Sequence, residues 1–189
     1  MTLMYHPLFQ SLLLPLFLSA VLGWLLRPAG LRWLILAPSF GLVLALAAWP
    51  GLVWPALART QMLPWWVLGA TLLAVAVLAW RRTAPQQPMG HTGVWLAALL
   101  GVIGLLLVVW GATGGSLLLA QLAGMLATVS GVATVLALLM RDNTGDRVAV
   151  WVGLLPLGVL AVGLALSLAA LPSSSSVGYD DDDPYYQAD

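Results

Sequence analysis

The chain has 189 residues, of which 61% are hydrophobic and only 7% are charged. Soluble domains carry about a quarter of their residues as Asp, Glu, Lys and Arg, so this composition excludes an ordinary water-facing surface and predicts one that faces lipid. The formal net charge of zero argues against a nucleic-acid partner, which needs a basic surface, and the lack of Cys excludes disulfides and thiolate metal sites.

Six apolar stretches, separated by short connections, approach or exceed the length of about 20 residues that a membrane-crossing helix needs. In chain order they cover residues 8–26, 31–49, 64–80, 93–111, 116–140 and 148–171. Short connections make consecutive helices antiparallel neighbours. We therefore predict an all-α fold, a polytopic transmembrane helical bundle of about six spans that forms one domain over residues 1–172. The remaining residues, 173–189, are rich in Ser and Asp and are expected to be a disordered tail.

The Arg residues predict the orientation of this bundle. The first, third and fifth connections contain six of them, which are Arg27, Arg32, Arg81, Arg82, Arg141 and Arg147. The second and fourth connections contain only Arg59. Because positive residues favour the cytoplasmic side, these six residues act as topology determinants and place both termini on the other side, an N-out and C-out arrangement.

The Trp residues give an independent indication of where the spans end. Nine of the ten Trp fall within a few residues of an expected span end, and Trp54 lies in the second connection. Indole rings prefer the headgroup level of a bilayer, so this placement is typical of an aromatic belt.

The second connection, residues 50–63, is too apolar for an ordinary exposed loop and too short to cross the bilayer. Pro50, Pro55 and Pro64 interrupt helix continuity there. An interfacial or shallow re-entrant segment fits these properties. The sequence leaves open whether it is a passive anchor or a lid that binds a partner.

A motif at the two ends of this connection has a counterpart elsewhere. Trp49-Pro50, followed by Gln61-Met62-Leu63-Pro64-Trp65-Trp66 between two apolar helices, resembles a segment of uncharacterised bacterial multi-pass inner-membrane proteins. The resemblance implies a bacterial cytoplasmic (inner) membrane location. It implies no activity, so no functional residue follows from it.

The second and sixth stretches share a pattern. Trp33-x4-Pro38-x2-Gly41 is echoed by Trp151-x4-Pro156-x-Gly158, and both stretches run outward from the expected cytoplasmic side. A repeated two-helix hairpin is one interpretation. Aromatic-belt Trp and packing Gly, which recur in many membrane proteins, are the other.

The fifth stretch contains two candidate functional faces. Gly124, Ala127, Gly131 and Thr134 recur at steps of three and four residues, so they share one helix face on which another helix could pack closely. The same helix contains three polar residues, which are Gln121, Thr128 and Ser130. These are the candidate lining of a solute pathway.

Residues for catalysis or ion coupling are scarce. Ion-coupled transport normally places an ionisable side chain inside the membrane, and none lies well inside a stretch. His6 and His91 fall on opposite expected faces, so they cannot share one metal or haem. We expect no catalytic, cofactor-binding or metal residues. The sequence favours a non-catalytic membrane subunit or scaffold that contacts a membrane protein, or its own copies, through helices. The alternative is a small oligomeric permease or channel for a neutral or weakly polar solute.

Overall fold

The computed structural model describes residues 6, 9–56, 58–81, 87–88, 91–140, 144–145 and 147–171. Its longer elements are α1 (Leu14–Leu26), α3 (Ala37–Ala48), α4 (Arg59–Trp80), α5 (Thr92–Thr113), α6 (Leu117–Met140) and α7 (Arg147–Ala169). Its short elements are the π-helix η2 (Phe9–Leu13), the 3-10 helix η3 (Arg27–Ala29), the helix α2 (Leu31–Leu34), and the strands β1 (Gln87–Pro88) and β2 (Thr144–Gly145). The expected tail at 173–189, Arg82 and Arg141 lie outside the described residues.

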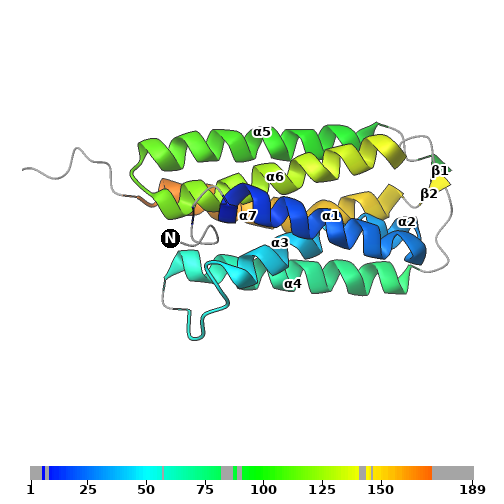
Figure 1. The fold of residues 1–189 in the computed structure, drawn as a ribbon, viewed down its shortest axis with the longest axis horizontal. Helices are drawn as coiled ribbons and strands as arrows, with labels where there is room; N and C mark the ends of the chain where they lie inside the picture. The colour runs from blue at the N-terminus through cyan, green and yellow to red at the C-terminus, as the bar shows by residue number, and fades with distance from the viewer. Residues whose placement is uncertain are drawn as a thin grey trace, which may run out of the picture.

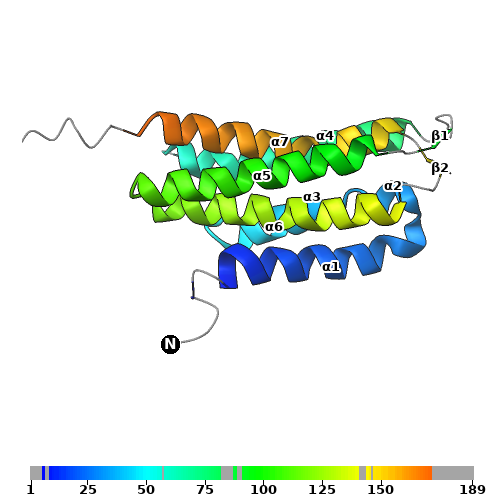
Figure 2. The ribbon, with the colours of Figure 1, turned by 90° about the horizontal axis from the view of Figure 1, so that it is seen from above.

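The long helices lie side by side along one axis (Figures 1 and 2). Elements α1, α4 and α6 run in one direction, and α2 with α3, α5 and α7 run back. Five segments in the described chain are long and apolar enough to cross a membrane: Phe9–Ala29, Thr60–Trp80, Thr92–Thr113, Leu117–Met140 and Arg147–Ala169. The described part of the chain is therefore helical apart from the two-residue strands, and its long apolar helices are those expected of a membrane protein.

The two ends of the bundle differ in the number of Arg residues. Helices α1 and α4 end, and α2, α5 and α7 begin, at the end that contains the backbone of Arg27, Arg32, Arg81 and Arg147 (Figure 1). We call this the arginine-rich end. The antiparallel pairing of β1 with β2 joins two connections there. Arg59 starts α4 at the opposite, arginine-poor end, where α1 also begins and α7 ends.

Residues 31–49, expected as the second span, do not form one continuous helix. A turn at Ile35 and Leu36 separates α2 from α3, and α3 alone has 12 residues. Pro38 contributes to the break, because it has no N–H to bond to the carbonyl of Leu34. Ile35 and Leu36 are buried, so the break lies inside the bundle.

The third helix begins earlier than the sequence suggested. Helix α4 starts at Arg59 rather than at 64, and Pro64 lies inside its first turns. The N–H of Ala58 donates to Oε1 of Gln61 at 3.2 Å, which satisfies a backbone group at the start of α4. Because Pro64 is near the N-terminus of α4, the carbonyl that lacks an N–H partner also lies in the first turn, and the rest of the helix keeps its hydrogen bonds.

Helix α6 lies at the centre of the bundle, packed against η2, α1, α3, α5 and α7. Its closest contact is with α5. An added Cβ on Gly104 would lie 2.8 Å from the backbone N of Ala127, and one on Gly111 would lie 2.8 Å from the backbone N of Ala120. Only a residue without Cβ lets the two backbones approach this closely.

These contacts predict different outcomes for two alanine substitutions on α5. Gly104→Ala should lower the free energy of unfolding by about 1–3 kcal/mol, because the new methyl group meets the backbone of Ala127 and the helices must separate. Gly101→Ala is the control, since its Cβ would make an ordinary contact of 3.6 Å with Cβ of Ser130. Thermal unfolding in detergent, followed by tryptophan fluorescence, measures both. Equal melting temperatures for the two variants would contradict this account of the contact.

Candidate functional site

The structure distributes the small residues of α6 among different neighbours. An added Cβ on Gly124 would lie 3.4 Å from Cβ of Ser11 in η2, and Ala127 packs against Gly104 of α5. Gly131 is exposed, with no atom within 4 Å of an added Cβ. The candidate packing face is therefore used inside the bundle at Gly124 and Ala127, and it is open at Gly131.

The candidate polar lining does not surround a shared space. The Thr128 hydroxyl donates to the carbonyl of Gly124 at 2.9 Å, and that of Thr134 donates to the carbonyl of Ser130 at 2.8 Å, so both bond to their own helix. Ser130 is fully buried beside Gly101, and its Oγ has no hydrogen-bond partner among the described residues. Gln121 is 9% exposed, close to the arginine-poor end of α6.

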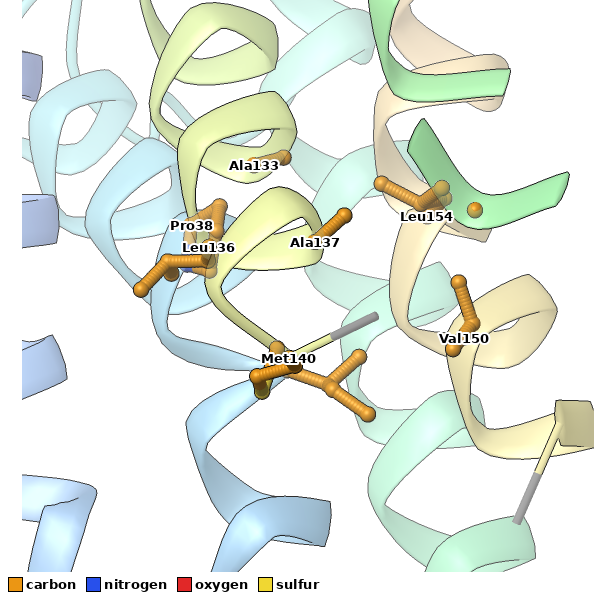
Figure 3. A pocket seen from close by; sticks show the side chains of 9 residues that line it. Pro38, Ala133, Leu136, Ala137, Met140, Val150 and Leu154 are labelled. Carbon is orange, nitrogen blue, oxygen red and sulfur yellow. The ribbon is translucent and has the colours of Figure 1, made fainter. Parts of the chain in front are cut away.

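A small cavity lies instead near the arginine-rich end, between α3, α5, α6 and α7 (Figure 3). Its volume is about 30 Å³, and Pro38, Ala133, Met140, Val150 and Leu154 are among the side chains around it. A space of this size holds a water molecule, but an apolar wall offers that water no partner. None of Gln121, Thr128 and Ser130 lines this cavity.

The break between α2 and α3 lies against α7, close to this cavity. The buried hydroxyl of Ser39 donates to the carbonyl of Gly153 at 2.7 Å, and a Cβ on Gly153 would collide with Cγ2 of Ile35. The structure thus brings together the two segments that share the Trp and Pro pattern. Sequence reasoning missed Ser39, whose only distinguishing feature was a hydroxyl beside Pro38 in an apolar stretch.

An apolar groove runs along α7 between α4 and α5, and we call it the α7 groove. Its volume is about 650 Å³. It is lined by Trp66, Leu96, Leu100, Trp151, Val152, Leu154, Leu155, Gly158, Val159, Val162 and Gly163. From Trp151 to Gly163 it follows α7 for about 18 Å at the helical rise. Gly158 in its wall has no atom within 4 Å of an added Cβ, so the groove is open there.

The two His residues lie apart. Both His6 and His91 are exposed, and His91 precedes α5 at the arginine-rich end while His6 precedes η2 at the other end. No group of three His, Cys, Asp or Glu that could hold a metal ion occurs in the described part of the chain. All seven Asp fall in the connection before α7 or in the tail, outside the described ranges.

The bond between Ser39 and Gly153 makes a testable contribution to stability. Ser39→Ala should lower the free energy of unfolding by about 0.5–1.5 kcal/mol, because α3 loses its hydrogen bond to α7. Thr71→Val is the control: Thr71 is also buried, but its hydroxyl bonds within α4 to the carbonyl of Val67 at 2.8 Å. Removing that local bond while keeping the shape should change the stability much less. Equal losses in the two variants would argue against a role for the α3–α7 bond.

Comparisons with known proteins assign no family to the chain. No protein-family model, no curated protein and no solved structure matches the chain. The features that bear on function are the open groove, the buried hydroxyls and the two ends of the bundle.

Proposed function

We propose that this protein is a non-catalytic subunit or scaffold of a membrane complex, and that it acts through helix–helix contacts. The α7 groove is the docking surface, and its occupant is a transmembrane helix of a partner membrane protein. The observation that carries the proposal is the open wall at Gly158, in a groove that runs along most of an apolar helix.

The proposal places the bundle across the inner membrane of a bacterium with six crossings. The interrupted segment α2–α3 is the second crossing, since residues 31–48 extend about 27 Å at the helical rise. The arginine-rich end faces the cytoplasm. The arginine-poor end, where η2 starts and α7 ends, faces the other side. The exposed side chains between the ends are large and apolar, as on α5, where Leu105 and Leu106 are 60% and 65% exposed.

The Trp residues support these boundaries. Trp24, Trp33, Trp80, Trp95 and Trp151 lie toward the arginine-rich end, and Trp49, Trp54, Trp65, Trp66 and Trp110 lie toward the other. On α5, the rise from Trp95 to Trp110 is about 22 Å, and on α4 that from Trp66 to Trp80 is about 21 Å. Two aromatic levels at this separation fit just inside a hydrocarbon core of about 30 Å.

A helix suits the α7 groove for a physical reason. Lipid tails are as apolar as Leu and Val, so a helix gains little from leaving lipid for a groove of ordinary side chains. Where Cβ is missing, the two backbones approach, and dispersion and Cα–H···O contacts favour the pair. Gly158 offers such a point, whereas Gly104 and Gly111 are already covered by α6.

The alternative is a small oligomeric permease that uses Gln121, Thr128 and Ser130. The bonds of Thr128 and Thr134 to their own helix favour the subunit over this alternative. With its proton used within the helix, each of these hydroxyls can accept a hydrogen bond from a solute but cannot donate one.

Two single-cysteine variants test the orientation, because the natural chain has no Cys. Ala29 and Ala170 are both exposed, Ala29 at the arginine-rich end and Ala170 just after α7. In intact cells, a membrane-impermeant maleimide should label Ala170→Cys, and it should label Ala29→Cys only after the membrane is opened. Labelling of both from the same side would overturn the six-crossing arrangement.

Two leucine substitutions test the groove. Gly158→Leu should block a partner helix and reduce recovery of the partner about tenfold or more, a loss of about 1.4 kcal/mol or more in binding free energy. Gly69→Leu is the matched control, because Gly69 is also a helical glycine with open space around it but lies outside the groove. The measurement is quantitative mass spectrometry of proteins that co-purify in mild detergent.

The proposal fails if Gly158→Leu and Gly69→Leu retain the same partners in equal amounts. It also fails if the purified protein is a homo-oligomer without another component and Thr128→Val abolishes solute uptake, which is the result that the permease predicts. Tryptophan fluorescence melting of both variants shows whether a lost partner reflects misfolding.

A further inference from the structure

The connection between α3 and α4 is a compact loop with internal braces. Indole Nε1 of Trp65 donates to the carbonyl of Val53 at 3.0 Å, and the rings of Trp54 and Trp65 meet edge to face, with centroids 5.8 Å apart and planes at 72°. At the start of the loop, the N–H of Gly51 donates to the carbonyl of Leu46 at 2.9 Å, with φ of 97° at Gly51. These contacts tie both branches of the loop to the helices that it joins.

The tip of this loop presents apolar side chains outward. Leu52, Val53 and Trp54 are 38%, 45% and 81% exposed, and no residue from Pro50 to Ala56 carries a charge. Three adjacent apolar side chains held outward in water are unfavourable, and their hydration cost scales with the exposed area. The position of the loop therefore decides what covers them.

The loop projects to the side of the bundle rather than beyond its end. In Figure 1 it leaves the arginine-poor end next to the start of α4 and turns away from the other helices, roughly across the bundle axis. It thus stays beside the arginine-poor end, toward which Trp49, Trp66 and Trp110 lie in their elements. Under the proposed placement, this end lies at the boundary between acyl chains and headgroups. A sideways projection at that level lies in the plane of the bilayer surface.

We infer that the loop at 50–56 is an interfacial anchor, with Leu52, Val53 and Trp54 inserted into the headgroup layer of the non-cytoplasmic leaflet beside the bundle. The inference rests on the proposed membrane placement. A lipid surface fits the loop because the segment is uncharged, amphipathic at Trp54 and directed along the membrane plane. Apolar groups of this kind enter the boundary between headgroups and acyl chains to a depth of about 5–10 Å.

The internal bond from Trp65 gives the anchor its mechanical effect. Since Trp65 belongs to α4 and Val53 to the loop tip, the inserted tip is fixed to the first turns of α4. Interfacial aromatic side chains set the tilt and depth of a membrane helix. The loop therefore fixes the depth of α4, which forms one wall of the α7 groove.

Spin labels on single cysteines test the anchor in lipid nanodiscs of phosphatidylcholine and phosphatidylglycerol. A label on Val53→Cys should collide with lipid-soluble oxygen much more often than with a water-soluble nickel chelate. The ratio of its oxygen collision rate to its nickel-chelate collision rate should be several times the ratio for a label on Ala29→Cys. Ala29 is exposed at the other end of the bundle. Leu72→Cys, 60% exposed in the middle of α4, reports whether the bundle itself is embedded.

The outcomes separate the anchor from the membrane placement. A Val53 ratio equal to that of Ala29, with an embedded Leu72, would overturn the anchor and leave the proposed placement intact. Low collision with both reagents at Val53 would mean that a second copy of the protein covers the loop, which also overturns the anchor. If the labels at both Val53 and Leu72 collide mainly with the nickel chelate, both positions lie in water and the membrane placement is overturned.

A second substitution tests the brace. Trp65→Phe keeps an aromatic ring but removes the N–H that donates to Val53, so the label on Val53→Cys should become more mobile and more accessible to the nickel chelate. Trp110→Phe, at the same end of the bundle but in α5, should leave that label unchanged. Equal effects of the two substitutions, or no effect of Trp65→Phe, would contradict the brace.

Discussion

The close approach of helix backbones at glycine is the contact on which the rest of this bundle depends. Gly104 and Gly111 bring α5 onto α6, Gly41 brings α3 onto the backbone of Ser19 in α1, and Gly153 brings α7 onto Ile35. Between lipid-facing helices the hydrophobic effect offers little, since apolar side chains are as well solvated by lipid tails as by one another. Dispersion between closely packed backbones then determines which helices pair and in which register.

The α5–α6 register follows from this constraint. Along α5, Gly111, Gly104 and Gly101 are separated by the same steps as Ala120, Ala127 and Ser130 along α6, and each faces its counterpart. Helix α1 and the element before it obey the same constraint with two partners. The preceding element η2 packs on α6 through Ser11 and Gly124, and α1 itself packs on α3 through Ser19 and Gly41.

The ends of the long helices could be predicted because they depend on local composition. Apolar length, the alternation of Arg and the position of Trp each mark a boundary, so five of the expected stretches match helices to within a few residues. The break at Ile35 could not be predicted. Pro38 is as compatible with a kink as with a break, and which of the two forms depends on the contacts of Gly153 and Ser39 in the packed structure. Likewise the spacing on α6 identified a face of small residues, but not that η2 covers Gly124, that α5 covers Ala127 and that Gly131 is left open. The α7 groove is formed by three helices distant in sequence and had no local pattern.

The hydroxyls of the bundle show why polar residues in a membrane helix are weak evidence for a pathway. Thr71, Thr128, Thr134 and Ser167 each donate to the carbonyl four residues before, which satisfies the donor inside one helix where no water is available. Ser19 and Ser130 have no hydrogen-bond partner among the described residues, yet each lies opposite a glycine, Gly41 and Gly101. Ser19 occupies the volume that a Cβ on Gly41 would take, whereas Ser130 only makes an ordinary contact with the position of a Cβ on Gly101. Size therefore explains Ser19 as well as polarity does, and the hydroxyl of Ser39 joins α3 to α7 at the break.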